Sequence, residues 1–380
     1  MKKFLSLPID WFILAIPIVL TTIGIVTIYT ITYPDYHWKL TFDQITYAAI
    51  GLTAMVILMF TDYRMFSSIP GIIYLVGLLF LAPLLPFLAP KLPFVTSTFG
   101  ATRWIDLGFF QIQPSEIFKL LGAIVAAAFL SKRVGRITVS AMAAYAVMMA
   151  IPLVMVYLEP NLSTTIVLLV MFTGMFLAAK PSGRMVAILV GVALVAVPIV
   201  FFSLKPYQRT RIDTFLHLST SSQNTENTDN KTNGKDYNVK QSLIAVGSGG
   251  LTGQGFGQGS QTVLNFLPVA HSDFIFAGFA EATGFIGSFI LLGLYILLIM
   301  RIITLAGLSV DPFGQLLAVG LSIKIFFQVV VHVGTNLGLL PVTGIPLPFM
   351  SYGGTSMIID LASIGILLNI YIRHKKFIFS

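Results

Sequence analysis

The chain has 380 residues, 56% of them hydrophobic and only 10% charged, whereas soluble domains carry roughly 25% charged residues, so most of this chain is expected to lie in a bilayer. The absence of cysteine excludes disulfides, thiolate nucleophiles and cysteine metal sites. The formal charge of +8 comes from basic residues scattered in short loops, which favours control of membrane topology over binding of nucleic acid.

Ten apolar runs are each close to the length of about 20 residues that a spanning helix needs. The sequence therefore predicts an all-α polytopic membrane protein with one domain over residues 1–380. The first run lacks a small-residue cleavage site, so it is interpreted as an anchor and not as a signal peptide. The predicted spans are 11–31, 44–60, 69–88, 113–131, 137–157, 162–180, 184–203, 273–300, 313–335 and 356–373.

The placement of lysine and arginine predicts the orientation of these spans. With a cytoplasmic N-terminus, most basic residues fall in inner segments, and the short outer loops carry only Lys39, Lys91 and Arg103. This distribution follows the positive-inside rule, which gives little weight to the basic residues of one long loop. Both termini are therefore expected in the cytoplasm. The long loop 204–272 then lies outside, as do loops 89–112 and 336–355.

The long outer loop has two parts. Residues 219–236 are of low complexity and nearly free of apolar side chains, so this segment is predicted to be disordered. From Tyr237 onward the loop contains seven glycines, which permit positive φ angles and close backbone approach. Two interpretations stay open for this second part: a flexible surface loop, or a segment that closes over a substrate.

One carboxylate, Asp273, stands where the long loop meets the eighth span. It directly precedes the apolar run FIFAGF and is flanked by His271 and Ser272, so its side chain is expected at the outer membrane interface. A helix-capping role is the alternative, because Asp and Ser commonly satisfy the free amides at a helix start.

Two ionisable residues in the fourth span, Glu116 and Lys119, lie three positions apart and therefore share a helix face. An internal ion pair would make their burial tolerable. A pair lining an outward cavity is also compatible with the sequence, because the span begins on the outer side near Gln113. Ionisable residues at membrane depth are functional candidates by default.

The other ionisable residues within spans are expected to have structural roles. Lys324 and Asp360 are predicted to pair with each other, Glu281 to make a polar contact between helices, and His332 to pack with a hydrogen bond. No spacing of His, Asp and Glu in the sequence makes an all-protein metal site.

Three arginines of the outer loops are candidates for binding phosphate. Arg103 stands beside Trp104, and Arg209 and Arg211 stand in the run YQRTRIDTFL. Arginine binds phosphate oxygens in a bidentate manner and keeps its charge. A solvated surface is the alternative for each of them.

Five long motifs, in family order and within ten spans, carry a resemblance to the SEDS (shape, elongation, division and sporulation) family, which includes RodA and FtsW. The motifs are ATRWIDLGFFQIQPSEIFKL, YQRTRIDTFL, QSLIAVGSGGLTGQGFGQGSQ, LPVAHSDFIFAGFAEATGFIG and LLPVTGIPLPFMSYGGTS. The wording of the loops favours a RodA-like member.

The resemblance implies a peptidoglycan glycosyltransferase that polymerises lipid II on the outer face of the bacterial plasma membrane. It also implies a partner, a class B penicillin-binding protein with transpeptidase activity. The family's essential acid corresponds to Asp273. The expected substrate-binding residues are Arg103, Glu116, Lys119, Arg209, Arg211, His271 and Ser351. No organic cofactor is expected, and a divalent cation such as Mg²⁺ is a further candidate for neutralising the leaving group.

The sequence departs from the family pattern after the fifth span, where Asn161 replaces the usual aspartate. Any role of that carboxylate is then absent or shifted to Glu159. Two rival functions remain open: a lipid II flippase or other transporter, and a non-catalytic scaffold for the transpeptidase. A carrier should have broken helices or internal repeats with a site near the midplane, and no convincing repeat is seen.

Overall fold

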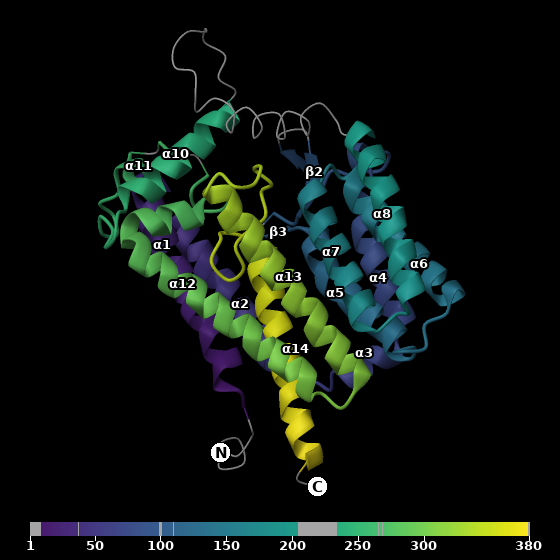
Figure 1. Ribbon diagram of the computed structural model, residues 1–380. Coiled ribbons are helices and arrows are strands. Elements are labelled where there is room, and N and C mark those ends of the chain that lie inside the picture. The colour runs from purple at the N-terminus through teal and green to yellow at the C-terminus, as the bar shows by residue number, and fades with distance from the viewer. Residues whose placement is uncertain are drawn as a thin grey trace.

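The computed structural model describes residues 9–36, 38–98, 101–108, 110–203, 234–264, 266–267 and 269–378. These residues form a bundle of long helices with one small sheet (Figure 1). The helices are α1 (Trp11–Tyr36), α2 (Lys39–Phe60), α3 (Arg64–Ser68), α4 (Pro70–Leu81), α5 (Pro114–Ser131), α6 (Val139–Leu158), α7 (Leu162–Ala178), α8 (Gly183–Ser203), α10 (Gly234–Ser248), α11 (Ser260–Val263), α12 (Ile275–Leu308), α13 (Pro312–Asn336) and α14 (Gly354–Ile378), with 3-10 turns at Ala82–Leu84 and Ala89–Lys91.

Within the described part of the chain, seven helices are long and apolar enough to cross a membrane: α1, α2, α5, α6, α12, α13 and α14. Shorter apolar helices cover the other three predicted spans, at Pro70–Leu84, Leu162–Ala178 and Gly183–Leu194. The prediction of a mostly helical chain with several apolar spans is therefore confirmed. That ten helices cross the membrane stays a prediction.

The core of the bundle is built on α5, α13 and α14, whose side chains are buried along most of their lengths. Helix α2 packs along α14 at close range. A Cβ atom at Gly365 of α14 would lie 2.4 Å from the carbonyl oxygen of Met55 in α2. Small residues allow two helix backbones to approach in this way. Large apolar side chains such as Leu194 and Phe289 point outward and are 71% and 68% exposed, as expected for surfaces that face lipid.

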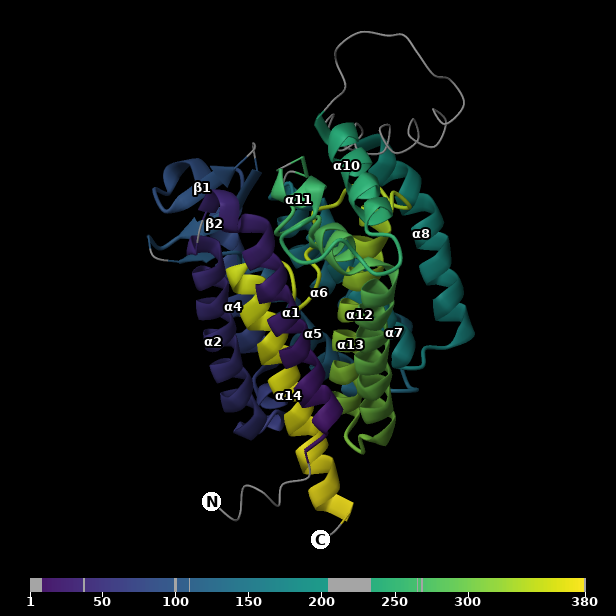
Figure 2. The ribbon, with the colours of Figure 1, turned by 90° about the vertical axis from the view of Figure 1, so that its left-hand side faces the viewer.

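The start of α1 and the end of α14 lie at one end of the bundle, and the small sheet, α10 and α11 lie at the other (Figures 1 and 2). The sheet has three antiparallel strands, β1 (Val95–Thr98), β2 (Ala101–Asp106) and β3 (Gln111–Ile112), in the order β1-β2-β3. It occupies the predicted outer loop 89–112, so that loop contains regular structure.

The long helix α12 is broken at Gly284, which has φ 67° and ψ −163°. A residue with a side chain rarely adopts such a conformation. The glycine-rich loop is bound at this break, because the N–H groups of Gln254 and Gly255 donate to the carbonyls of Glu281 and Ala282, both at 2.9 Å. The N–H groups of α12 just beyond the break donate in turn to loop carbonyls at positions 250 and 251. The loop therefore forms hydrogen bonds with backbone N–H and C=O groups of α12 that lose their helical partners at the break.

Part of the predicted long loop is helical. In α10 the side chains of Val239, Ser242 and Ala245 are buried, and the Ser242 hydroxyl donates to the carbonyl of Asn336 at 2.8 Å. Their spacing of three residues places them on one face of α10, which packs against α12 and α13. Most of the segment predicted to be disordered, 219–233, lies outside the described residues.

Candidate functional site

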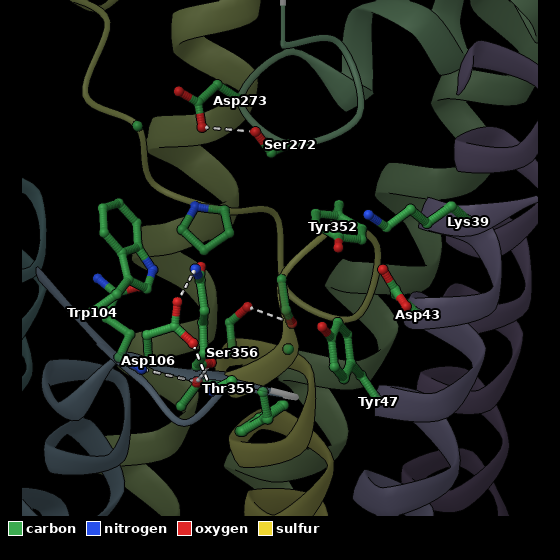
Figure 3. Close-up of a pocket in the computed structure, with 18 residues that line it drawn as sticks. Lys39, Asp43, Tyr47, Trp104, Asp106, Ser272, Asp273, Tyr352, Thr355 and Ser356 are labelled. Carbon is green, nitrogen blue, oxygen red and sulfur yellow. Dashed lines mark hydrogen bonds between the residues drawn. The ribbon is translucent and has the colours of Figure 1, made fainter. Parts of the chain in front are cut away.

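A polar pocket of about 590 Å³ opens at the end of the bundle that carries the sheet (Figure 3). Its walls come from α2, from the β2–β3 hairpin, from the residues before α12 and from the loop between α13 and α14. The lining residues are Lys39, Asp43, Tyr47, Trp104, Asp106, Gly108, Phe110, Gln111, Gln113, Ser272, Asp273, Gly344, Pro346, Tyr352, Gly353, Gly354, Thr355 and Ser356. A concave site with a few convergent polar groups is the usual form of a ligand-binding site.

Asp273, the predicted essential acid, lies in the wall of this pocket and is half-buried. The Ser272 hydroxyl donates to its Oδ1 at 3.3 Å. Gly344 lies against the other carboxylate oxygen, since a Cβ atom there would be 3.5 Å from Oδ2. Helix α12 begins at Ile275 with Phe274 in the N-cap position and no side-chain cap. Asp273 is therefore not the N-cap residue of α12.

The backbone around Asp273 is held by hydrogen bonds from two other segments. The three consecutive carbonyls of residues 271–273 each accept one bond from a different donor. The donors are the Tyr352 N–H at 2.9 Å, the Ser351 hydroxyl at 2.8 Å and the Asn336 side-chain amide at 3.1 Å, in that order. Such bonds fix the orientation of a short segment, as a site that must hold one geometry requires.

Asn336 makes the most central of these contacts. It is the last residue of α13 and is fully buried. Its Oδ1 accepts the N–H of Ala277 at 3.0 Å, and its Nδ2 also donates to the carbonyl of His332 at 2.8 Å. One side chain thus joins the end of α13 to the first turn of α12, where helix N–H groups lack partners within the helix.

Gln44 of α2 fixes the loop that carries Ser351 and Tyr352. Its Nε2 donates to the carbonyl of Ser351 at 3.2 Å, and its Oε1 accepts the N–H of Gly353 at 3.3 Å. The Gln44 side chain is fully buried, so both bonds are shielded from water. Helix α2 is in this way connected to the segment that contains Asp273.

Replacing Asn336 with leucine should lower the kcat of a reaction that depends on Asp273, measured on folded protein. Leucine fills similar space but removes a donor to Asp273 and an acceptor for Ala277, and leaving buried groups unsatisfied costs about 1–3 kcal/mol. Asn369→Leu is the matched control. That asparagine is also buried and also bridges two segments, accepting from Tyr63 at 3.1 Å and donating to Met59 at 2.6 Å.

Both asparagine variants are expected to melt at lower temperature, whereas only Asn336→Leu is expected to reduce kcat at unchanged KM. The measurement is steady-state kinetics at a temperature where both variants are folded. Equal kcat values for the two variants would contradict a positioning role for Asn336.

Among the residues that the structure describes, none of those predicted to bind substrate lines the pocket. Ser351 is 3% exposed, and its hydroxyl is used internally, donating to Ser272 and accepting the N–H of Leu347 at 2.8 Å. His271 is half-buried, packs edge-on against Tyr352 with ring centroids 5.5 Å apart, and has a pKa lowered by burial. Both residues therefore lie behind the pocket wall and support it.

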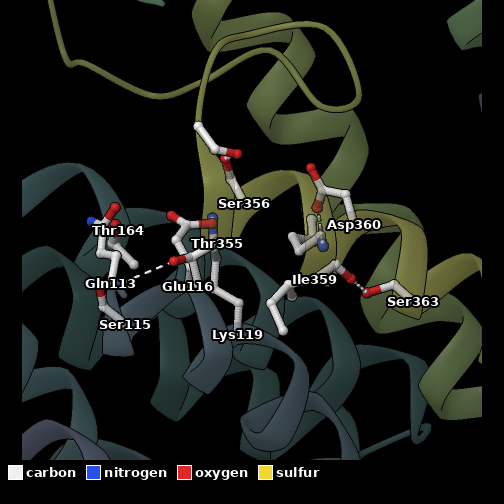
Figure 4. Close-up of polar contacts among 12 residues, drawn as sticks. Gln113, Ser115, Glu116, Lys119, Thr164, Thr355, Ser356, Ile359, Asp360 and Ser363 are labelled. Carbon is white, nitrogen blue, oxygen red and sulfur yellow. Dashed lines mark hydrogen bonds and ion pairs between the residues drawn. The ribbon is translucent and has the colours of Figure 1, made fainter. Parts of the chain in front are cut away.

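Arg103 and Lys119, the two predicted substrate-binding cations that the structure describes, do not line this pocket. Arg103 is half-buried on β2 and donates to the carbonyl of Pro160. Lys119 is paired with Glu116 at 2.6 Å, and both side chains are almost fully buried (Figure 4). The ion-pair prediction is confirmed. The pair lies in α5 one to two turns beyond Gln113, a pocket-lining residue. Arg209 and Arg211 lie outside the described residues.

The segment that departs from the family pattern contains a buried acid. Glu159 is fully buried, and neither carboxylate oxygen has a hydrogen-bond partner among the described residues. Burial raises the pKa of Glu159 to about 9, while Arg103 acts in the opposite direction. Asn161 donates to the Ser115 hydroxyl at 3.2 Å and caps α7 by accepting the N–H of Thr164 at 3.3 Å. Asn161 thus has a local structural role.

The other ionisable residues within the helices are paired as expected. The Lys324 ammonium lies 2.7 Å from the Asp360 carboxylate, with both side chains buried. The His332 Nδ1 lies 2.8 Å from the carbonyl oxygen of Ile345. Glu281 accepts the N–H groups of Gln261 at 2.8 Å and Thr262 at 3.1 Å. Glu281 therefore contacts α11. The prediction that it makes a polar contact between helices is confirmed.

Within the described residues, no group of three or more His, Cys, Asp or Glu side chains is placed to hold a metal ion. A divalent cation such as Mg²⁺ thus stays a prediction.

Several pocket residues were not predicted from the sequence to belong to the site. Lys39, Asp43 and Tyr47 follow one another at spacings of four on α2, and Trp104 and Asp106 alternate along β2. These are the spacings at which helix and strand residues share one face. These patterns span only a few residues each. They indicate a site only when the residues on the opposite wall of the pocket are known.

Comparisons with known proteins agree with one another. Residues 7–376 match the family model described as cell cycle protein, FtsW, RodA and SpoVE. The chain is 35% identical over 331 residues to the peptidoglycan glycosyltransferase MrdB of Escherichia coli K12, covering 86% of this chain and 84% of that protein. It is 33% identical over 376 residues to a probable peptidoglycan glycosyltransferase FtsW of Geobacter metallireducens, covering 96% and 95%.

Two solved structures have similar folds. One is a chain from a study of polymerization and crosslinking by a peptidoglycan synthase complex, with a TM-score of 0.77 and 28% identity, covering 97% of this chain and 98% of that chain. The other is the rod shape determining protein RodA of Thermus thermophilus, with a TM-score of 0.68 and 27% identity, covering 98% of both chains.

Proposed function

The chain belongs to the FtsW, RodA and SpoVE family of cell cycle proteins, and we propose that it is a peptidoglycan glycosyltransferase that joins lipid II units into glycan strands. Relatives that bear the name peptidoglycan glycosyltransferase align with more than four fifths of this chain. The observation that carries the proposal is the Asp273 carboxylate in the wall of a polar pocket that the β2–β3 hairpin also lines. That hairpin lies at the end of the bundle away from the start of α1 (Figure 1).

The proposed orientation has both termini in the cytoplasm and the pocket at the outer face of the plasma membrane. The distribution of basic residues supports this orientation. The start of α1 and the end of α14 share one end of the bundle, which is compatible with it. The sugars of lipid II would then enter the pocket from outside, while its lipid tails stay in the bilayer.

In the proposed reaction, a hydroxyl of the acceptor sugar attacks the anomeric carbon of the donor. The O–H bond breaks and its proton passes to the Asp273 carboxylate, which acts as general base. The bond from the anomeric carbon to the pyrophosphate oxygen breaks on the opposite face, and its electron pair leaves with polyprenyl pyrophosphate. Configuration at the anomeric carbon therefore inverts.

The leaving pyrophosphate gains negative charge, which fixed cations would stabilise. Arg103, Arg209 and Arg211 are the proposed contacts. Lys119 fits this role less well, because its charge is already balanced by Glu116 at 2.6 Å and it is buried. A divalent cation such as Mg²⁺ is a further candidate for this role, although the described residues contain no group of three or more His, Cys, Asp or Glu side chains placed to hold it.

A class B penicillin-binding protein is the proposed partner, since it would crosslink the strands that this enzyme makes. Support comes from the similar chain of a peptidoglycan synthase complex that couples polymerization with crosslinking.

The function is tested with purified protein and lipid II in detergent or liposomes. An enzyme forms glycan polymer from lipid II supplied on the outside. A carrier moves labelled lipid II between leaflets and forms no polymer. A scaffold does neither. Polymer formation by the purified chain is the expected result, and either of the other outcomes contradicts the proposal.

A further inference from the structure

An indole, a carboxylate and an amide lie side by side on the β2–β3 hairpin. Trp104 and Asp106 are two residues apart on β2 and so point to the same face of the strand. Gln111 on β3 is paired in register with Asp106. All three residues line the pocket, so they form one continuous surface, here called the hairpin surface.

The hairpin surface is fixed before any ligand arrives. The N–H of Gly108 donates to Asp106 Oδ1 at 2.8 Å, and Gln111 Nε2 lies 3.4 Å from Asp106 Oδ2. The hairpin is also attached to the start of α14, because Thr355 Oγ1 accepts the N–H of Gln113 at 3.0 Å and donates to the carbonyl of Gln111 at 3.3 Å. Fixed side chains lose little conformational entropy when a ligand binds.

We propose that the hairpin surface binds the ring of a 2-acetamido sugar of the lipid-linked substrate. An acetamido group presents one N–H donor and one carbonyl acceptor, and the Gln111 amide offers the complementary acceptor and donor. The ionised Asp106 carboxylate accepts only, with room for ring hydroxyls besides its internal bonds. The Trp104 indole supplies apolar area for the C–H face of the ring. This inference rests on the proposed function.

The charge of the lining favours a neutral sugar over the pyrophosphate at this position. Three aspartates and one lysine line the pocket: Asp43, Asp106, Asp273 and Lys39. Like charges disfavour each other across a binding surface. The pyrophosphate is therefore expected to lie outside this pocket, towards Arg103, and the sugar within it.

The hairpin surface and Asp273 belong to different walls of the same pocket (Figure 3). A ring lying on Trp104 and held by Gln111 has its edge hydroxyls in the space between the two walls. The hairpin surface would thus decide which sugar is accepted, and Asp273 would act on that sugar's hydroxyl.

The test is a binding measurement on protein that carries Asp273→Asn, so that no turnover occurs. The probes are lipid II and lipid II with its acetyl groups removed. Gln111→Ala should weaken lipid II binding about tenfold, the equivalent of about 1.4 kcal/mol, within the net worth of a hydrogen bond. The deacetylated probe should bind with the same affinity whether residue 111 is glutamine or alanine. Gln254→Ala is the control, because that exposed amide bonds Ser248 on the glycine-rich loop and does not line the pocket.

Selective loss of lipid II binding by Gln111→Ala, with Gln254→Ala unchanged, is the expected result. Equal affinities of Gln111→Ala and the control for lipid II would overturn the inference, and so would an equal loss for both probes. In protein with Asp273 intact, Gln111→Ala should raise KM and leave kcat within about twofold, because it removes binding shared by ground state and transition state. The binding result does not depend on catalysis, so a failure of Asp273 as the base would be seen separately, as polymer formed by Asp273→Asn.

Discussion

Replacing Asp273 with asparagine is expected to abolish practical glycan polymerisation while the protein still inserts and folds. The amide has nearly the same shape as the carboxylate but cannot accept the proton of the attacking hydroxyl. Loss of a general base typically costs about 10²–10⁴ in rate. The side chain is half-buried at a pocket wall and is not the cap of α12, so the substitution should cost little stability.

The measurement is polymer length and rate from lipid II with purified wild type and variant, beside a detergent melting curve. Asp62→Asn is the matched control, an aspartate 41% exposed and paired with Arg373 at 2.9 Å near the end of α14. An exposed pair of this kind contributes about 0–1 kcal/mol, so the control should polymerise like wild type. Polymer formed by Asp273→Asn at the wild-type rate would remove Asp273 from the base role.

Replacing Glu116 with alanine is expected to destabilise the protein strongly. The change leaves the Lys119 ammonium in a site where its side chain is 1% exposed. Removing one partner of a buried pair costs about 3–5 kcal/mol, because the remaining charge is unpaired. Helix α5 is also among the most buried elements, so little water can reach the ammonium. A lower melting temperature in detergent checks this expectation.

The double variant Glu116→Leu, Lys119→Met separates stability from function. Replacing both partners of a buried pair by apolar residues is often neutral or stabilising, so the double variant should melt close to wild type. If it also polymerises lipid II normally, the pair is structural. If it folds but is inactive, the charges act on the substrate. A single Glu116→Ala variant as stable as wild type would contradict the account of the pair.

Much of the fold could be predicted from the sequence for two reasons. A helix that crosses a bilayer needs an apolar run of a set length, and an unpaired charge within the bilayer costs much free energy. Each apolar run of about 20 residues coincides with a helix in the structure. The pairing of Lys324 with Asp360 followed from the cost of leaving either charge alone at membrane depth. The position of Asp273 immediately before α12 followed from the sharp change from polar loop to apolar run.

Other features could not be predicted because they depend on contacts between distant segments. The break at Gly284 is stable only because the loop near Gly250 supplies hydrogen bonds to α12. The hydroxyl of Ser351, expected to face the substrate, instead donates to Ser272. The pocket combines Asp43 of α2 with residues more than 200 positions away. No local pattern in the sequence reports such a combination.

The absence of cysteine from the chain allows a direct test of where the Asp273 side chain lies. Single variants Asp273→Cys, Leu339→Cys and Val310→Cys would be treated in intact cells with a thiol reagent that cannot cross the membrane. Leu339 and Val310 are 67% and 77% exposed and follow α13 and α12 respectively, so in the proposed orientation they report the outer and inner sides.

Labelling of positions 273 and 339 from outside, with position 310 unlabelled until the membrane is opened, is the predicted result. Added lipid II should protect position 273 and leave position 339 reactive. Labelling of position 273 only after the membrane is opened, or no protection by lipid II, would contradict a carboxylate that meets its substrate at the outer face.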